Sequence, residues 1–177
     1  YEIGDTTGPQ LPAAYFNVQG RVTEADLDRL MKRTKNDNIK ITSEKLGAHL
    51  GGDVRTTKAE KIEESFLIRL NANRKTEEQF RTLCHELAHI YCGHLGRPGP
   101  EDWWLERSDI GKSEAEFEAE GATYLALMRA GLSAGSAEYL SYFAKNCDLT
   151  KISPDTIIRA AGRIESHWKP GGSKDVV

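Results

Sequence analysis

Two histidines, His85 and His89, stand four residues apart in the string His85-Glu86-Leu87-Ala88-His89. Side chains with this spacing lie one turn apart on the same face of a helix, so both imidazoles can reach one metal ion. The intervening Glu86 is offset around the helix and can act on water beside the metal without ligating it. This arrangement predicts a zinc site at which Glu86 serves as the general base of a hydrolytic reaction.

A zinc ion that keeps an open position for substrate needs a third protein ligand. His94 follows the motif closely, but it is out of register with the metzincin pattern HExxHxxGxxH. That pattern would require glycine at Cys92 and histidine at Leu95. We therefore expect His94 to lie at the end of the helix or to support a ligand from outside.

The other candidates for the third ligand are four alternating glutamates in an acidic segment, residues 113–122. In gluzincins a helical glutamate is the third ligand, and an acid or amide four positions later supports a histidine ligand. Glu116 and Glu120 have this spacing, as do Glu114 and Glu118. Helical periodicity separates Glu116 and Glu120 from the apolar side, which favours Glu116 as ligand with Glu118 as the alternative. The same acids would also suit the positive start of a helix that binds no metal.

Further side chains near the motif could take part in binding or catalysis. Tyr91, Tyr124 and Arg107 could each stabilise the oxyanion of such a reaction, and the sequence does not choose among them. The pair Trp103-Trp104 precedes Arg107 in the segment between the motif and the acidic run. There Trp104 and its neighbour either line a substrate cleft or pack against the helices.

Local signals place the motif in the middle of a helix that Thr76 caps and Gly93 ends. Before it, residues 65–71 predict a strand, which could be an edge that pairs with an extended peptide substrate. Three further helices are predicted to follow, over residues 113–130, 134–146 and 153–167.

The N-terminal half predicts shorter elements. Residues 1–23 predict an extended arm, and Thr23 is placed to cap a helix that runs to about residue 35. A short strand over residues 39–41 and a short helix over residues 43–50 are predicted to follow. We therefore expect an α+β fold, in which a small twisted N-terminal sheet packs on the HExxH helix and a mostly helical C-terminal half follows.

Composition limits the class of protein. The 177 residues are predicted to form one domain, and a net charge of −3 gives no general attraction to nucleic acid. The chain holds no apolar run of membrane-spanning length, and residues 1–12 lack the features of a signal peptide, so we expect a cytoplasmic protein. Cys84, Cys92 and Cys147 lack CxxC spacing, which favours reduced thiols.

The motif and its surroundings resemble the ImmA/IrrE family of zinc metallopeptidases. The resemblance rests on residues 82–89, on Gly93-His94-Leu95 and on residues 116–120, and it covers residues 60–165. The acidic string also resembles the ExxA(D/N) ligand helix of CAAX prenyl proteases. This likeness implies that Glu116 is the ligand and that Glu120 is the acid that supports the site from outside the ligand set. The ImmA/IrrE family usually carries Asn at the position of Glu120.

The resemblance implies zinc as cofactor and a protein partner as substrate, often a helix-turn-helix repressor, cleaved in a stress or mobile-element response. A weaker similarity of residues 1–12 and 136–140 to ArdC-like antirestriction proteins implies an alternative. In that alternative the protein bears zinc without cleaving, and it masks a DNA-processing enzyme or holds single-stranded DNA. Glu86→Gln should separate the two, because only the peptidase needs a general base.

Overall fold

The computed structural model describes residues 18–57, 65–99, 102–134, 140–141 and 143–169. Its elements are α1 (Glu24–Arg33), the 3-10 helix η3 (Thr34–Asp37), β1 (Ile39–Glu44), β2 (Gly52–Thr56), β3 (Phe66–Asn71), α2 (Thr76–Tyr91), α3 (Lys112–Arg129), the 3-10 helix η4 (Leu149–Lys151) and α5 (Pro154–Trp168). The predicted α+β class is confirmed. Most of the predicted N-terminal arm, residues 1–17, lies outside the described residues.

The three strands form a mixed sheet in the order β1-β3-β2. β1 runs parallel to β3 with Ile39 opposite Phe66, and β2 runs antiparallel to it with Thr56 opposite Phe66. Every residue of β3 except Arg69 is buried, as befits a central strand covered on both faces. The strand predicted over residues 65–71 is thus confirmed, but the prediction that it is an edge is wrong, because β1 and β2 flank it.

The helix predicted over residues 43–50 is wrong. β1 continues to Glu44, and the chain then turns around the buried side chain of Asn71. The Asn71 amide donates hydrogen bonds of 3.0 Å to the Gly47 carbonyl and 2.7 Å to the Leu50 carbonyl. These bonds come from a residue more than twenty positions away, so tertiary contacts override the local helical pattern.

β2 was not predicted from the sequence, where Gly51-Gly52 looked like the end of a helix. Gly52 instead begins the strand at a point of close approach, since a Cβ there would lie 2.5 Å from the Arg69 carbonyl oxygen. The next residue, Asp53, accepts hydrogen bonds from the Arg69 guanidinium across the two strands. The glycine therefore serves strand pairing rather than helix termination.

Helix α1 begins as predicted, with a capping box in which Thr23 and Asp26 exchange hydrogen bonds. α2 begins one residue from the prediction, because Lys75 is the N-cap and Thr76 is the first helical residue. Gly93 follows the end of α2 with a φ of +80°, and a Cβ there would lie 1.9 Å from the Leu105 carbonyl oxygen. Only glycine therefore allows the chain to turn at this point.

The C-terminal helices agree with the sequence where they are described. α3 matches the helix predicted over residues 113–130 to within one residue at each end. α5 begins after Ser153, whose hydroxyl accepts from the Thr156 amide, and it confirms the helix predicted over residues 153–167. Much of the helix predicted over residues 134–146 lies outside the described residues.

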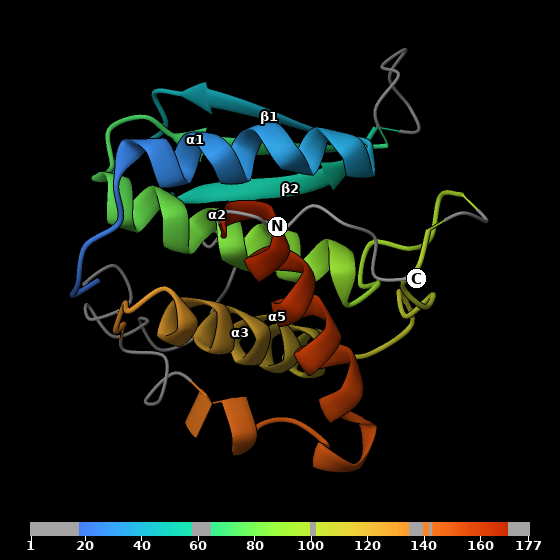
Figure 1. The fold of residues 1–177 in the computed structure, drawn as a ribbon. Helices are drawn as coiled ribbons and strands as arrows, with labels where there is room; N and C mark the ends of the chain where they lie inside the picture. Colours follow the sequence, from blue (N-terminus) through green and yellow to red (C-terminus); the bar gives the residue numbers. More distant parts are fainter. Residues whose placement is uncertain (1–17, 58–64, 100–101, 135–139, 142, 170–177) are drawn as a thin grey trace.

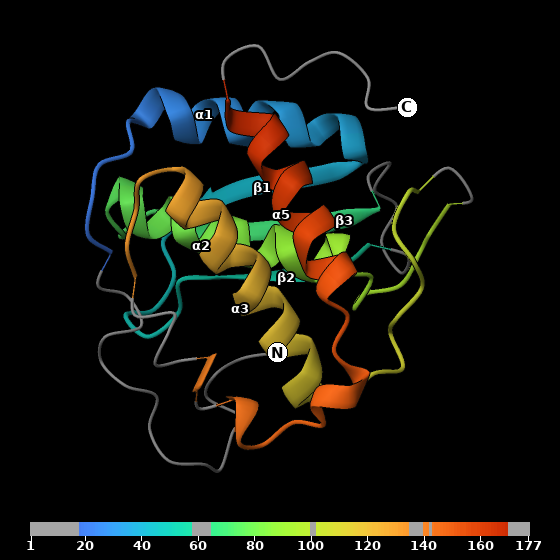
Figure 2. The same ribbon diagram turned by 60° about the horizontal axis from the view of Figure 1, so that its bottom comes forward.

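The elements stack so that α2 lies at the centre (Figure 1). It packs on β2 and β3 through one side, and α3 lies against its other side. α5 crosses α2 and α3 and reaches α1, as the rotated view shows (Figure 2). α2 therefore contributes heavily to the core, with Leu83, Leu87 and Ile90 fully buried. Within the described residues, no helix has the length and apolar character needed to cross a membrane.

Candidate metal centre

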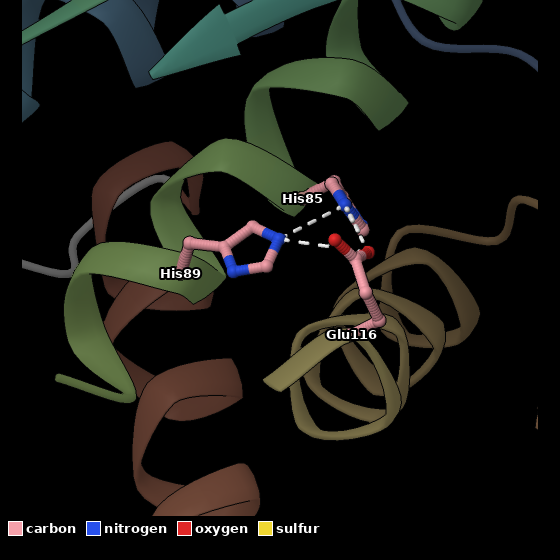
Figure 3. A group of neighbouring side chains, drawn as sticks. All are labelled: His85, His89 and Glu116. Carbon is pink, nitrogen blue, oxygen red and sulfur yellow. Dashed lines mark hydrogen bonds and ion pairs between the residues drawn. The ribbon is translucent and has the colours of Figure 1, made fainter. Parts of the chain in front are cut away.

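His85 and His89 lie on the side of α2 that faces α3 (Figure 3). The helix separates them by one turn, and their Nε2 atoms lie 3.2 Å apart. His85 is buried, and His89 is half-buried. The packing of α2 against the sheet and α3 therefore holds two imidazole nitrogens at a spacing that allows them to share one cation.

Glu116 completes the group from α3, and its carboxylate points toward both rings (Figure 3). Its Oε2 atom lies 3.5 Å from His85 Nε2 and 3.8 Å from His89 Nε2. Among the described residues, these three form one of two groups whose ligand atoms converge closely enough to hold a metal ion. The structure thus brings together the three residues that the sequence favoured as ligands.

The two carboxylates of the site have pKa values displaced in opposite directions. Burial raises the pKa of Glu116, but hydrogen bonds and charge interactions with His85 and His89 outweigh it and hold that pKa well below its usual range. Burial raises the pKa of Glu86, and the negative charges of Glu116 and Asp53 add to this, while the two histidines oppose it. Glu116 is therefore suited to ligation as an anion, and Glu86 to accepting a proton.

The outer nitrogen of His85 faces a buried ion pair. His85 Nδ1 lies 3.4 Å from Glu120 Oε2, and Arg81 Nη2 donates to both Glu120 oxygens at 3.0 Å. Both side chains of the ion pair are almost fully excluded from solvent. The structure places Glu120 beside His85, and the predicted role of Glu120 in supporting a histidine ligand stays a prediction. Arg81 was missed, although its position four residues before His85 on a buried helix face was a signal.

The outer nitrogen of His89 faces another imidazole. His89 Nδ1 lies 3.0 Å from His94 Nδ1, and His94 Nε2 lies 3.1 Å from Glu118 Oε2. Glu118 also accepts from the Arg107 guanidinium and, at 2.7 Å, from the Ser153 amide. Burial lowers the pKa of His94 to about 4, although Glu118 opposes the shift, so this ring is neutral near pH 7.

Comparison with known proteins agrees with this geometry. A family model described as the IrrE N-terminal-like domain matches residues 34–138, which is more than half of the chain. The chain belongs to this ImmA/IrrE metallopeptidase family. No curated protein and no solved structure matches it. The family match spans the HExxH helix and the acidic helix, so the His85, His89 and Glu116 group is the candidate metal site of an ImmA/IrrE peptidase.

The remaining glutamates of the acidic helix have other partners in this family member. Glu118, the alternative ligand, points to His94 and Arg107 and away from the three converging ligands. Glu114 lies near the start of α3 and accepts a 2.8 Å hydrogen bond from the Asp148 amide. The geometry therefore selects Glu116 among the candidates that the sequence left open.

Tyr91 does not lie at the metal centre, so its predicted role as an oxyanion donor is wrong. Its buried hydroxyl donates to Asp37 at 2.6 Å and lies 3.0 Å from His167 Nε2. Tyr91 is two positions after His89, which turns its side chain about 200° around α2 from that of His89. The sequence reasoning missed the buried cluster of Asp37 and His167, whose members are 130 positions apart.

Trp104 is buried, and its indole nitrogen donates to the Gly96 carbonyl at 3.1 Å. It packs against Phe66 and Tyr91, which fits the packing role among the two that the sequence left open, and its role in binding substrate stays a prediction. Arg107 is engaged by Glu118 and likewise does not point at the three ligands. Tyr124 lies two turns beyond Glu116 on α3, and its possible role in catalysis stays a prediction.

Proposed function

We propose that this protein is a zinc-dependent endopeptidase that cleaves a specific protein partner, with a helix-turn-helix transcriptional repressor as the substrate class. The observation that carries the proposal is the convergence of His85, His89 and Glu116, with Glu86 beside them, in a member of a metallopeptidase family. Two imidazoles and one carboxylate are the ligand set of many catalytic zinc sites, which leave the fourth position open.

The spacing of the ligand atoms fits zinc. With metal–ligand bonds of about 2.0–2.1 Å in a tetrahedron, neighbouring ligand atoms lie about 3.3 Å apart. The observed separations are 3.2, 3.5 and 3.8 Å. Small side-chain movements would equalise them, so His85 Nε2, His89 Nε2 and Glu116 Oε2 are the atoms that would hold the ion.

Zinc, when bound, supplies a Lewis acid that polarises a peptide carbonyl and makes water a nucleophile near neutral pH. The protein's own contribution centres on Glu86. Because burial raises the pKa of this carboxyl group, it can take a proton from the attacking water and return it to the departing amine. Glu86 is thereby the residue whose loss should abolish cleavage while leaving the ligands in place.

The position of β2 supports an extended peptide as the form of the substrate. β2 lies at one edge of the sheet and contacts α2, and within the described residues it pairs with β3 alone. Its Asp53 is close enough for its charge to raise the pKa of Glu86. An extended segment added alongside β2 would use backbone hydrogen bonds for affinity and would run past the general base.

Membership of the ImmA/IrrE family supports the narrower substrate class, since the sequence resemblance implies a repressor as target. The side chains of His85 and Glu116 are 8% and 23% exposed, so a substrate reaches the site only from the open side of Glu116. We therefore expect cleavage of few proteins, at one segment each.

The experiment is a comparison of the zinc-loaded wild type with Glu86→Gln. Each is incubated with the repressor-enriched fraction of a bacterial extract, new N-termini are labelled and identified, and the best substrate is then purified and cleaved alone. The wild type should produce a specific cut, and Glu86→Gln should reduce its rate by about 10²–10⁴-fold. Metal analysis should find one zinc in both proteins.

Three results would count against the proposal. Equal cleavage by both proteins would show that Glu86 is not the general base, and it would contradict the proposed peptidase activity of this site. Undiminished biological activity of Glu86→Gln would favour the alternative of a zinc-bearing binding protein in antirestriction. If metal analysis finds another ion at full occupancy, only the identity of the metal as zinc would be contradicted, and the peptidase proposal would stand.

A further inference from the structure

We propose that His94, Glu118 and Arg107 form a relay that positions His89 to bind the metal. The inference rests on the metal site proposed above and concerns how one of its ligands is held. His94 is a positioning residue in this scheme, because it acts through His89 and touches neither metal nor substrate. The relay joins the segment after α2, the middle of α3 and the start of α5.

The two ring nitrogens of His89 have different neighbours, so one can bind the metal while the other is held by a hydrogen bond. Its Nε2 atom faces His85 and Glu116, so its Nδ1 atom is the outer one. That outer atom lies 3.0 Å from His94 Nδ1, and the centroids of the two rings lie 5.2 Å apart in a T-shaped, edge-on arrangement. A metal-binding histidine that donates its second nitrogen to an acceptor is held in orientation and becomes a better ligand.

One assignment of protons satisfies the whole relay. A metal at His89 Nε2 requires the proton of that ring on Nδ1, which then donates to His94 Nδ1. His94 must accept there, so its own proton lies on Nε2 and donates to Glu118 Oε2 at 3.1 Å. With the opposite tautomer of His94, two N–H groups would face each other. The relay therefore selects the tautomer of His89 that leaves Nε2 available to the metal.

The surrounding backbone keeps His94 in reach of His89. The left-handed turn at Gly93 folds the chain back, and the His94 amide donates to the His89 carbonyl at 3.0 Å. The Arg107 amide in turn donates to the Gly93 carbonyl at 3.1 Å. The side chains of His94 and Glu118 are 4% and 0% exposed, so water cannot readily replace either partner. These contacts make the relay a fixed part of the fold.

A second metal ion is the rival explanation for the same residues. Cys92, His94 and Glu118 offer ligand atoms within 4.8 Å of one another. However, the Arg107 guanidinium already donates to Glu118, and His94 lies at hydrogen-bonding distance from the same carboxylate. A second cation would have to break the hydrogen bond between His94 Nε2 and Glu118 Oε2 and would lie close to the positive charge of Arg107, which bonds Oε1 of the same carboxylate. The relay instead uses every one of these contacts as it stands.

The test compares zinc affinity in the wild type, His94→Phe and a matched control, His167→Gln. His167 is also a buried histidine bonded to a carboxylate, but it lies in the Asp37 cluster away from the metal centre. Affinity is measured by competition with a chromophoric chelator, and zinc stoichiometry by metal analysis. His94→Phe should weaken zinc binding roughly 10–100-fold with one zinc per chain, and His167→Gln should leave the affinity unchanged.

A second readout follows the tautomer directly. In zinc-loaded protein labelled with ¹⁵N-histidine, His89 Nδ1 should carry a slowly exchanging proton that is lost in His94→Phe. Should His94→Phe fail to fold, Glu118→Gln tests the same relay, because it keeps the shape of the side chain and removes its charge. Its zinc affinity should fall in the same direction.

Two results would overturn the relay alone. One is a His94→Phe protein that binds zinc as tightly as the wild type. The other is a wild type that binds two zinc ions, of which His94→Phe loses one, because this outcome makes Cys92, His94 and Glu118 a metal site. A wild type that binds no zinc would instead overturn the proposed function together with the relay.

Discussion

The two histidine ligands are supported differently on the two sides of the metal centre. His85 faces a carboxylate, Glu120, which is neutralised by Arg81 in a pair that is buried almost completely. His89 faces a neutral imidazole, His94, and the carboxylate comes only one step further out. Both sides end in an arginine, so neither adds net negative charge to the site.

The origins of the supporting residues also differ. Arg81 and Glu120 both belong to long helices, and they meet because α2 and α3 pack together. The supports of His89 come partly from irregular segments, since Arg107 lies between α2 and α3 and Ser153 caps α5. Support for His85 therefore comes from within one packed helix pair, whereas support for His89 comes from segments docked on that pair. The loss of a residue should have different consequences on the two sides.

The largest expected difference between the two sides is in stability. Arg81→Met would leave the Glu120 carboxylate buried without its guanidinium, and we expect a loss of about 3–5 kcal/mol in unfolding free energy. On the other side Glu118 would keep His94 and the Ser153 amide. We therefore expect Arg107→Met to cost less, about 1.5–3 kcal/mol.

Urea denaturation of both variants in the presence of a chelator would measure these losses without a contribution from metal binding. Arg107 serves as the matched control, since it is also an arginine paired with a glutamate of α3, but its side chain is 17% exposed against 2% for Arg81. Equal losses, or a larger loss for Arg107→Met, would show that the two sides do not differ as the burial implies.

A smaller difference should appear in the dependence of stability on pH. Burial lowers the pKa of His94 in the folded, metal-free chain from 6.5 to about 4. Between these values the unfolded chain binds a proton that the folded chain excludes, so stability declines as the pH falls from 6.5 toward 4. This loss of stability becomes negligible well above pH 6.5, where neither the folded nor the unfolded chain binds the proton, and His94→Gln should remove it.

As the pH falls from 6.5 to 4, the wild type should lose on the order of 2 kcal/mol of unfolding free energy relative to His94→Gln. Urea denaturation of the metal-free proteins at a series of pH values would measure the shift. The interval from pH 7 to 8 is the internal control, because the difference should be constant there. A difference that stays constant down to pH 4 would contradict the burial-driven shift of His94.

Much of the metal centre could be predicted because its residues obey helical spacing. His85 and His89 are one turn apart, and Glu116 and Glu120 are another such pair, so two periodic helices determine the faces on which these side chains lie. Arg81 obeys the same rule, and a search for charged residues four positions from each ligand would have found it.

The residues that the sequence did not reveal depend on tertiary contacts. Asn71 converts an expected helix into a turn by bonding to backbone groups more than twenty residues earlier. The placement of Tyr91 is set by Asp37 and His167, which approach it from distant segments. Such partners leave no periodic signal in the sequence, because they are brought together only when separate elements pack.

The smallest expected effect concerns Glu114, which lies outside both supporting networks although it has the same helical spacing to Glu118 as Glu116 has to Glu120. Its carboxylate accepts from the Asp148 amide near the start of α3, and the amide oxygen of glutamine can accept the same bond. Glu114→Gln should therefore leave zinc affinity unchanged in chelator competition. Glu116→Gln is the matched variant at the next of the alternating glutamates. It should weaken zinc affinity by at least roughly 100-fold, since it alters a ligand rather than a supporting residue. Similar losses in the two variants would mean that the acidic helix acts on the metal through its summed charge, and that no single carboxylate is the ligand.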